Sequence, residues 1–453
     1  MTFLTESLSS AAISLASSSD IPIALIESTP ASFAFKHEHP FRRTSSSASL
    51  CASEVPRVDI VNGLRNAHVK LNLRSSSSET LSRLLLSLFI ALRVPGWDKA
   101  PLSPSSLSIR RSSGALMNEV YFVSSLSSIS LPTLLLRIYG SSANSLISRS
   151  RELHTLHTLS SRYHIGPRIY GTFTNGRIEE YFDSITLTPR DIRDKIMNRW
   201  IAVRMAEFHS ISISAVEGPL AISSQEGKSW EIGVEKNIKT WLQPAREVLA
   251  HPNMNQEDRT ALNIDNFIRQ WSRYIRWLSR IEKVEGPSKR VFAHNDLHSG
   301  NLLRLNSKLP QGTPDHCQIV VVDFEYAAPN PRAFDIANYF QEWMTDYQSS
   351  EPHQLRFSLY PTREERWSFY EAYLSHASSN KSGVPVVVRE ASMVQLEREV
   401  CNWSPACAGM WAIWSIVKAK DDVERGIVEG ELDYIAHAKC RMAAFFRGVE
   451  ELI

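Results

Sequence analysis

The sequence that decides the fold reads AHNDLHSGN at residues 293–301 and QIVVVDFEY at residues 318–326. In the first segment an Asp and an Asn stand five positions apart, just after a short apolar run. In the second, an Asp closes a strongly apolar run that predicts a buried strand. Phosphoryl transfer needs such a set, because one carboxylate accepts the proton of the attacking hydroxyl while an amide and another carboxylate hold magnesium.

Each motif alone is weak evidence, since Asp-x4-Asn recurs by chance and an Asp often ends a buried strand. The two together, in this order and with a short loop between them, are much rarer. We therefore assign Asp296 as the proton acceptor, and Asn301 and Asp323 as magnesium ligands, because magnesium prefers hard oxygen donors. The spacing matches the catalytic loop of protein kinases, but His-Asn-Asp and Asp-Phe-Glu differ from the protein-kinase sequences.

Several further segments resemble the choline/ethanolamine kinase family, most closely its fungal choline kinases. The resemblance covers about residues 65 to 450, and its motifs follow one another in the expected order. The matching segments are GALMN at 114–118, LLRIYG at 135–140, GRIEEY at 176–181, PNPRAFDIAN at 329–338 and WAIWS at 411–415.

The resemblance implies an α+β, two-lobed protein-kinase-like fold, with a small antiparallel β lobe that carries a helix and a larger, mainly α lobe. We predict a Ser-rich disordered tail at 1–57, the small lobe at 58–182, and the large lobe with the catalytic loop and substrate pocket at 183–453. A short helix over residues 3–15 is the alternative for the tail. The tail fits neither a signal peptide nor a transit peptide, because acidic residues precede its first basic one, Lys36.

Composition bounds the possible partners and the compartment. With 43% hydrophobic residues in 453, the chain can bury two sizeable cores. The net charge of +2 gives no electrostatic case for a nucleic acid or an anionic membrane. Five scattered cysteines indicate reduced thiols in a cytoplasmic protein. The apolar stretch Leu84 to Leu92 is too short to span a bilayer, so we expect a core helix and no transmembrane segment.

Periodicity predicts the local structure around the site. Strands are expected at 107–109, 119–124 and 133–139, and a helix at 147–163. A second helix is expected to begin at Thr188, where a capping Thr, a Pro and an Asp follow one another as at helix starts. Its core-facing residues would be Ile192, Ile196, Trp200 and Val203.

The predicted nucleotide site combines residue chemistry with the resemblance. Arg137 stands where protein kinases place a Lys, as it does in the family, and its guanidinium could fork onto phosphates and pair with Glu152. The resemblance implies that the Gly114 loop cradles phosphates and that residues 179–182 hold adenine. Without the catalytic motifs, Arg137 would be interpreted as a surface cation and the loop as a plain turn. The expected ATP-binding residues are Ser113, Gly114, Asn118, Arg137, Glu152, Glu180 and Phe182.

The resemblance also implies an aromatic cage for an ammonium substrate. Cation–π attraction suits a methylated nitrogen, which cannot donate hydrogen bonds. For a Trp pair at helical spacing, ordinary core packing is the alternative. The sequence departs from the family pattern at His298, where choline kinases commonly carry Gln, and in a longer segment before Tyr434. Asp335 is expected to brace the catalytic loop. The implied substrate residues are Tyr326, Glu342, Tyr347, Trp411, Trp414 and Tyr434.

The leading hypothesis is ATP- and Mg²⁺-dependent phosphorylation of choline to phosphocholine, in phosphatidylcholine synthesis by the CDP-choline route. An ethanolamine kinase serving phosphatidylethanolamine, or an enzyme accepting both alcohols, is the alternative. An aminoglycoside-type phosphotransferase shares the loop chemistry, but its substrates call for an acidic rim. A pseudokinase, a binding protein that keeps the fold without the chemistry, is a different class. Such proteins usually lack the base, the Asn or the metal-binding Asp, whereas this chain has all three, as Asp296, Asn301 and Asp323. The expected partners are an amino alcohol and ATP, and a homodimer is left open.

Overall fold

The computed structural model describes residues 55–72, 78–112, 118–140, 148–217, 231–379, 388–427 and 432–453. Residues 1–54 of the predicted tail lie outside this part, as do Ser113 and Gly114 of the predicted phosphate loop. No described helix has the length and apolar character needed to cross a membrane.

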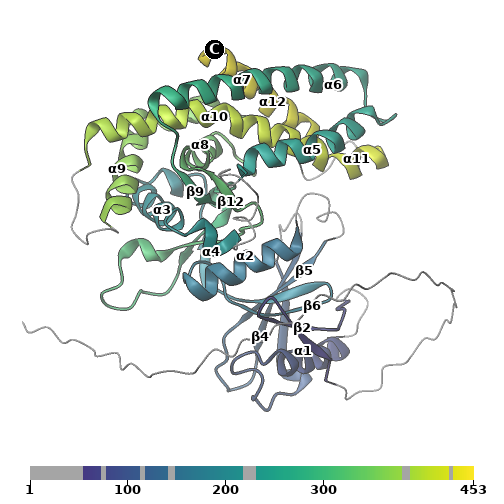
Figure 1. Ribbon diagram of the computed structural model, residues 1–453. Helices are drawn as coiled ribbons and strands as arrows, with labels where there is room; N and C mark the ends of the chain where they lie inside the picture. The colour runs from purple at the N-terminus through teal and green to yellow at the C-terminus, as the bar shows by residue number, and fades with distance from the viewer. Residues whose placement is uncertain are drawn as a thin grey trace, which may run out of the picture. The chain divides into compact units, whose positions relative to one another are not determined.

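Seven strands form a sheet in the order β1-β2-β6-β7-β5-β4-β3, and α1 and α2 lie beside it (Figure 1). Neighbouring strands are antiparallel except for β2 and β6. The three strands predicted from the sequence are confirmed, with small changes at their ends. The strands are β1 (Val58–Val61), β2 (Leu64–Ala67), β3 (Leu107–Arg111), β4 (Asn118–Ser125), β5 (Leu134–Tyr139), β6 (Ile169–Phe173) and β7 (Gly176–Glu180).

Strand β5 shows how this sheet separates a core from a pocket. Successive side chains of a strand point to opposite faces. Leu134 and Leu136 are therefore buried together, whereas Leu135 and Arg137 line a pocket on the other face. Helix α1 (Ser78–Leu92) contributes apolar residues to the buried face, which confirms the predicted core helix.

Helix α2 (Arg149–Arg162) confirms the helix predicted at 147–163. Its buried residues Leu156 and Leu159 belong to the large core that the later helices form, rather than to the core under α1. After α2 the chain turns at Gly166, whose φ of +74° favours a residue without a side chain.

Beyond β7 the chain enters a different sheet. Strand β8 (Ser184–Thr186) pairs with β10 (Leu302–Leu305), which also pairs with β11 (Ile319–Val321). Strand β9 (Arg290–Ala293) pairs with β12 (Ala328–Pro331). The division between lobes at 182/183 stays a prediction; the strands before and after it, β7 and β8, belong to separate sheets.

The helix predicted to begin at Thr188 begins seven residues later. Thr188 and Asp191 do form the expected reciprocal contact: the Thr188 hydroxyl donates to Asp191 Oδ2 at 2.7 Å and accepts from the Asp191 N–H at 3.2 Å. That contact leads into a short 3-10 turn, Asp191–Arg193. Helix α3 (Lys195–Phe208) is capped instead by Asp194, whose carboxylate accepts from two backbone N–H groups.

The later start rotates the buried face of α3. Ile196, predicted to face the core, is 59% exposed, so that prediction was wrong. Met197, Ile201 and Met205 are buried in its place, at helical spacing. Trp200 and Val203, which we also placed in the core, are partly buried.

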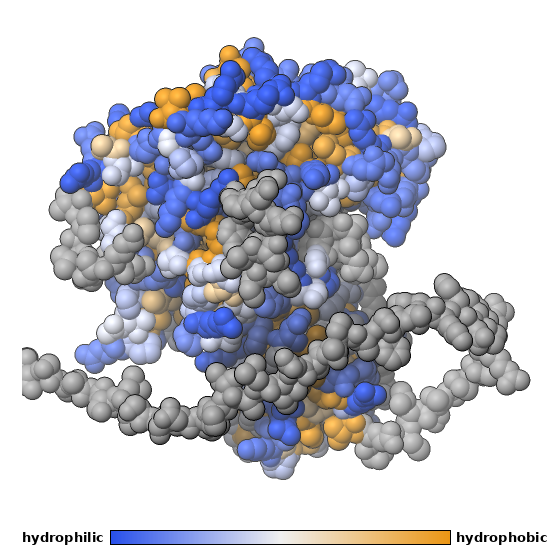
Figure 2. Space-filling view, in the orientation of Figure 1, coloured by the Kyte–Doolittle hydropathy of each residue, from blue (hydrophilic) through white to orange (hydrophobic). Residues whose placement is uncertain are grey.

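The rest of the described chain is mainly helical, and α10 runs beside α5 and α12 (Figure 1). On the face shown in Figure 2, hydrophobic residues are interspersed among more numerous hydrophilic ones. The remaining helices are α4 (Ile213–Glu217), α5 (Gly233–Ala250), α6 (Gln256–Ala261), α7 (Ile264–Glu285), α8 (Arg332–Glu342), α9 (Arg363–Ser379), α10 (Glu390–Lys418), α11 (Lys420–Arg425) and α12 (Tyr434–Leu452).

Candidate active site

The loop after β9 is held by a buried carboxylate on α8. Asp335 accepts hydrogen bonds from the backbone N–H groups of His294 at 2.9 Å and Asn295 at 2.7 Å. His209 Nε2 donates to the same carboxylate at 2.9 Å. Burial raises the pKa of Asp335, but the contacts with His209 and His294 lower it by more. The pKa therefore lies below its usual value, and the carboxylate stays ionised. The prediction that Asp335 braces the catalytic loop is confirmed.

Asn295 ties this loop to the segment that follows Asp323. Its backbone has a φ of +67°, in the left-handed region that Asn adopts more readily than most residues. Its side chain donates to the carbonyl of Tyr326 at 2.9 Å and accepts from Asn330 at 2.7 Å. Sequence analysis assigned no role to Asn295 or Asn330, because their contacts join segments more than 30 residues apart and arise only in the folded chain.

The structure brings together the three residues predicted for catalysis. Asn301 Nδ2 donates to the carbonyl of Asp296 at 2.9 Å and approaches its carboxylate at 3.4 Å. The N–H of Val322 donates to the carbonyl of Asn301 at 3.0 Å, so Asp323 follows directly beside it. Asp323 itself has a φ of +67°, a turn that ends β11 abruptly. Strand pairing and this turn thus create the site from two separate segments.

Three acidic side chains, Asp296, Asp323 and Glu325, form what we call the carboxylate cluster. Burial raises the pKa of Asp296 well above its usual value, and the charges of Glu342, Glu325 and Asp323 raise it further. Burial, followed by the charge of Asp323, raises the pKa of Glu325 to about 8. Glu325 belongs to the Asp-Phe-Glu motif, but sequence analysis gave it no role. Its position two residues after Asp323 could have indicated that it lies near the predicted metal site.

The donor set of the cluster suits a hard divalent cation. Asp323 Oδ1 is buried and accepts no hydrogen bond from any described residue. Asn301 donates through Nδ2 and so keeps its carbonyl oxygen as an acceptor. Across the described ranges, no group of three or more His, Cys, Asp or Glu residues could hold a metal on its own. A cation here would therefore combine Asn301 and Asp323 with oxygens from another molecule, as magnesium does with nucleotide phosphates.

A pocket of about 400 Å³ adjoins the cluster on the sheet side. Four predicted site residues line it: Arg137, Glu180, Phe182 and Asp323. Arg137 Nη1 lies 3.6 Å from Asp323 Oδ2, which links the sheet to the carboxylate cluster. Asn118, predicted to bind nucleotide, begins β4 opposite Tyr139.

The predicted pair between Arg137 and Glu152 is wrong. Glu152 accepts from Arg177 at 2.7 Å and Arg149 at 2.8 Å, and Arg137 Nε lies 3.4 Å from Glu179. Arg137 and Arg177 are direct neighbours across β5 and β7, so these like charges need carboxylates between them. Sequence analysis gave Arg177 no role and placed Glu179 only in the segment expected to hold adenine, because strand register alone makes the two residues neighbours of Arg137. We call Arg137, Arg149, Glu152, Arg177 and Glu179 the arginine–glutamate network.

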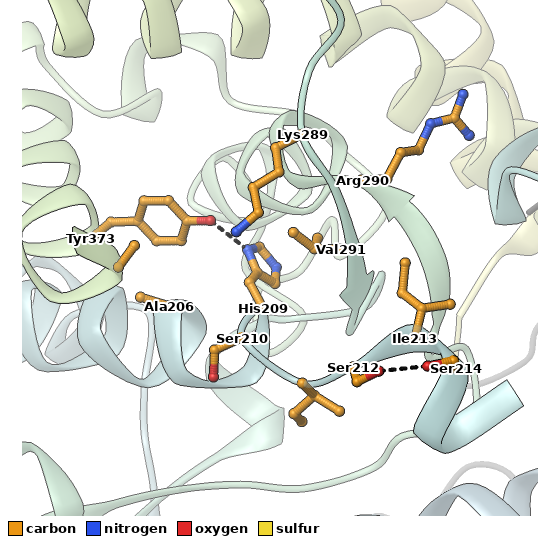
Figure 3. Close-up of a pocket in the computed structure, with 12 residues that line it drawn as sticks. Ala206, His209, Ser210, Ser212, Ile213, Ser214, Lys289, Arg290, Val291 and Tyr373 are labelled. Atoms are coloured by element: carbon orange, nitrogen blue, oxygen red, sulfur yellow. Dashed lines mark hydrogen bonds between the residues drawn. The ribbon is translucent and has the colours of Figure 1, made fainter. Parts of the chain in front are cut away.

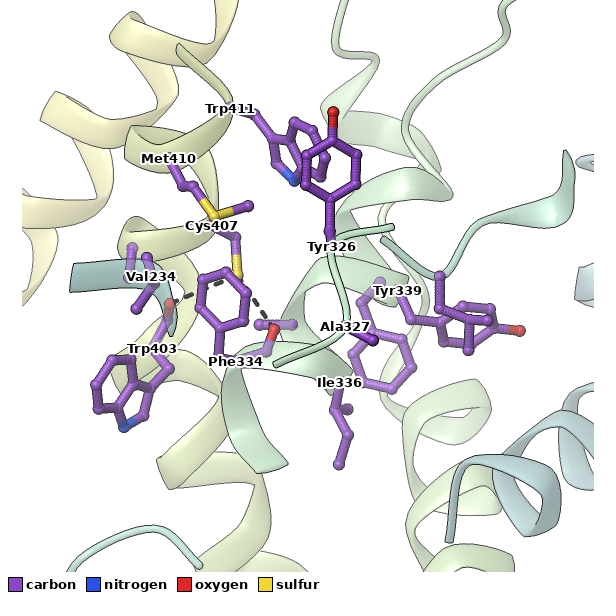
Figure 4. Close-up of a cluster of buried hydrophobic side chains, with 14 of the residues drawn as sticks. Val234, Tyr326, Ala327, Phe334, Ile336, Tyr339, Trp403, Cys407, Met410 and Trp411 are labelled. Atoms are coloured by element: carbon purple, nitrogen blue, oxygen red, sulfur yellow. Dashed lines mark hydrogen bonds between the residues drawn. The ribbon is translucent and has the colours of Figure 1, made fainter. Parts of the chain in front are cut away.

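The predicted aromatic residues meet one another. Tyr326 and Trp411 lie next to each other (Figure 4). Their rings contact edge to face with centroids 5.5 Å apart, and Trp411 contacts Trp414 at 5.3 Å. Trp414 also donates to the Tyr326 hydroxyl at 2.7 Å and contacts Tyr434 at 5.9 Å. The ammonium of Lys418 lies 5.8 Å from the Tyr434 ring centroid, so that ring already faces a cation.

Glu342, the acidic residue of the predicted substrate site, is hydrogen-bonded to other side chains of the protein. Glu342 accepts from Tyr347 at 2.9 Å, from Thr345 at 3.2 Å and from Arg441 at 2.8 Å. Tyr347 in turn faces the His298 ring at 6.2 Å, and His298 Nδ1 accepts from a backbone N–H of its own loop. Arg441 was missed, although it stands seven residues, two helical turns, after Tyr434 on one face of α12.

A second pocket, of about 460 Å³, lies beside the residue that braces Asp335. His209 Nδ1 accepts from the Tyr373 hydroxyl at 2.9 Å, and both residues line this pocket together with Lys289 (Figure 3). His209 also hydrogen-bonds to Asp335, so the pocket shares a side chain with the support of the catalytic loop.

A small sheet beside a mainly helical part, with an Asp-x4-Asn loop and a second Asp meeting at a pocket, defines a kinase of the protein-kinase-like fold. Residues 109–446 match the family model for choline/ethanolamine kinase. The chain belongs to the choline/ethanolamine kinase family, as its sequence motifs indicated.

Individual relatives carry both substrate names. A choline kinase of Schizosaccharomyces pombe is 32% identical over 81% of this chain and 89% of its own length. An ethanolamine kinase of Saccharomyces cerevisiae is 28% identical over 87% of this chain and 75% of its own length. The solved structure of a Plasmodium vivax ethanolamine kinase, 22% identical, matches 83% of this chain and 91% of its own with a TM-score of 0.62. That likeness confirms the predicted fold class.

Proposed function

We propose that this kinase transfers the terminal phosphoryl group of ATP to choline, in the presence of Mg²⁺, and releases phosphocholine. The observation that carries the proposal is the position of Asp296. It contacts Asn301 of the predicted metal site, and the charge of Glu342, in the predicted substrate site, contributes to the raised pKa of its carboxyl group. The reaction requires a base that can reach the hydroxyl of the amino alcohol while the phosphoryl group is bound nearby.

In the proposed mechanism, Asp296 orients the choline hydroxyl and accepts its proton. A general base works best when its pKa is near the operating pH, and the raised pKa of Asp296 moves it in that direction. Asn301 and Asp323 would hold magnesium, with Glu325 near Asp323. A bound magnesium ion would offset the negative charge of the phosphates.

On the nucleotide side, Arg137 would contact phosphate oxygens, because its guanidinium lies beside Asp323. Glu180 and Phe182 would border the adenine through the backbone at the end of β7. Ser113, Gly114 and Asn118 are proposed for the phosphate loop. Glu152 is proposed to act through Arg177, since its carboxylate points to that guanidinium rather than to Arg137.

On the substrate side, Tyr326, Trp411, Trp414 and Tyr434 would face the methylated ammonium, with Glu342 and Tyr347 beside them. The edge-to-face contacts among the rings support a shared aromatic site. Ethanolamine, or both alcohols, is the second candidate, because relatives of both names match the chain. Phosphocholine would serve phosphatidylcholine synthesis in the cytoplasm, and a homodimer is compatible with this activity.

The decisive experiment measures ADP release by the purified full-length chain with choline, with ethanolamine and with no acceptor. We expect turnover that needs Mg²⁺, is abolished by EDTA and is faster with choline. Asp296→Asn serves as the inactive control. Nucleotide consumption independent of both alcohols would contradict the proposal, and a clear preference for ethanolamine would favour the second candidate.

A further inference from the structure

The carboxylate of Glu342 has a protein donor on each of its oxygens. Arg441 donates to Oε1 and Tyr347 donates to Oε2, while the Thr345 hydroxyl lies 3.2 Å from Oε2 but donates over a shorter distance, 2.8 Å, to the Glu342 carbonyl. A carboxylate offers about four acceptor positions, so about two are left. A primary ammonium carries three N–H donors that lose water on binding, and each needs an acceptor. A quaternary ammonium carries none.

The charge of Glu342 is also balanced within the protein. Its side chain is 6% exposed and that of Arg441 only 1%, so the pair is hidden from water. Screening is weak at such a site, and the guanidinium offsets most of the attraction that the carboxylate would exert on a substrate cation. Aromatic faces then remain as the main attraction, and these favour a large, weakly hydrated cation.

Arg441 is itself held in place from the side of the aromatic residues. Ser415 donates to the carbonyl of Trp411 at 2.7 Å, and His437 Nδ1 lies 2.7 Å from the Ser415 hydroxyl oxygen. His437 therefore donates through Nδ1, which leaves its Nε2 as an acceptor facing Arg441 Nε at 3.4 Å. Burial first, and then the charge of Arg441, lower the pKa of His437 well below its usual value, so the ring stays neutral.

We propose that Arg441 sets the substrate class of this site: by occupying Glu342, it makes the ammonium pocket poor in acceptors and selects alcohols by the number of methyl groups on nitrogen. The inference rests on the proposed function and adds a residue that touches no reacting atom. Arg441 is thus a positioning residue for specificity.

The test uses ethanolamine and its N-methyl, N,N-dimethyl and N,N,N-trimethyl forms, the last being choline. For the full-length wild-type protein we expect kcat/KM to rise with each methyl group. Isothermal titration calorimetry of the same four alcohols should give dissociation constants in the same order. This series needs no variant, so a folding defect cannot obscure it.

The variant that isolates Arg441 is Arg441→Met. It frees one acceptor position and the charge of Glu342, so the preference for choline over ethanolamine should fall about tenfold, as expected for one hydrogen bond to a charged group. The double variant Glu342→Gln/Arg441→Met removes both charges, leaves no unpaired buried ion and should restore a preference for the methylated alcohols.

Arg332→Met is the matched control. Arg332 forms a similar pair with Glu399, at 2.9 and 3.0 Å, elsewhere among the helices. Its loss should lower the melting temperature and leave the choline-to-ethanolamine ratio unchanged. If the ratio falls equally in this control, a general loss of stability explains the effect and the inference is overturned.

Failure of the inference differs from failure of the proposed function. If the wild-type protein phosphorylates all four alcohols but shows no methyl dependence, or if Arg441→Met leaves the ratio unchanged, the inference is wrong and the kinase activity stands. If it phosphorylates none of the four, the proposed function itself is wrong.

Discussion

Two groups of charges meet at Asp323, and they differ in burial and in how they are balanced. The arginine–glutamate network contains three guanidiniums and two carboxylates within one sheet and one helix. Burial raises the pKa of Glu152, but Arg177 and Arg149 more than offset it and lower the pKa below its usual value. In the carboxylate cluster, burial and neighbouring acids act together and raise the pKa of Asp296 and Glu325.

This difference in charge balance distinguishes the network, which supports the structure, from the cluster, which is the candidate functional site. A buried charge whose partners come from the protein contributes to a defined arrangement, and removing one partner leaves the other unpaired. In the cluster, three partly buried carboxylates share one nearby guanidinium, that of Arg137 at 3.6 Å from Asp323, and such an excess of negative charge suits a site that awaits a cationic ligand. The network therefore positions Arg137, and the cluster is expected to receive magnesium and the substrate proton.

The largest effect should come from Asp296→Asn. Loss of the proposed proton acceptor and of its orienting charge should reduce kcat by about 10²- to 10⁴-fold. Because the variant removes one charge from a group of like charges, we also expect a slightly higher melting temperature without ligands. Turnover assays and thermal unfolding of the same preparation measure both. Near wild-type turnover would remove Asp296 from the mechanism.

The next largest effect should be on stability, in Arg177→Met. The change leaves Glu152 and Glu179 short of a buried partner, which should cost about 3–5 kcal/mol of unfolding free energy. Urea unfolding measures the loss. Arg83→Met, which removes an exposed pair with Glu79 in α1, is the control and should have a much smaller effect. Equal losses in the two variants would contradict the contrast between the buried network and surface pairs.

A smaller and more selective effect is expected in Trp414→Ala. One cation–π contact is worth about 1–2 kcal/mol when desolvated, so KM for choline should rise roughly tenfold and KM for ATP much less. Trp277→Ala, which alters a partly buried Trp on α7, serves as the control. A parallel rise of KM for choline and ATP would mean that Trp414 acts through packing.

The smallest effect is a pH dependence of stability without ligands. The pKa of Glu325 is raised from 4.5 to about 8, so between these values the folded protein holds a proton that the unfolded chain has released. Stability should therefore fall as pH rises through this window. Glu325→Gln, or Mg²⁺ with ATP, should reduce the slope of melting temperature against pH. An unchanged slope in both cases would place the titrating group elsewhere.

The sequence alone determined the chemistry that depends on local order. The spacing of Asp296 and Asn301, and an Asp at the end of a Val run, indicate the proposed catalytic set without reference to the fold. Residue patterning likewise located β4, β5 and α2, and the apolar stretch Leu84 to Leu92 located the C-terminal part of α1, because each signal depends on residues close together in the chain. The resemblance to the family added the substrate residues.

The tertiary structure decided which charges became partners. Arg177 displaced Arg137 as the partner of Glu152 because the register of β5 and β7 placed the two arginines side by side. Arg441 reached Glu342 across 99 residues because α12 lies near the end of α8. Such pairs follow from packing and strand register, which local spacing does not encode.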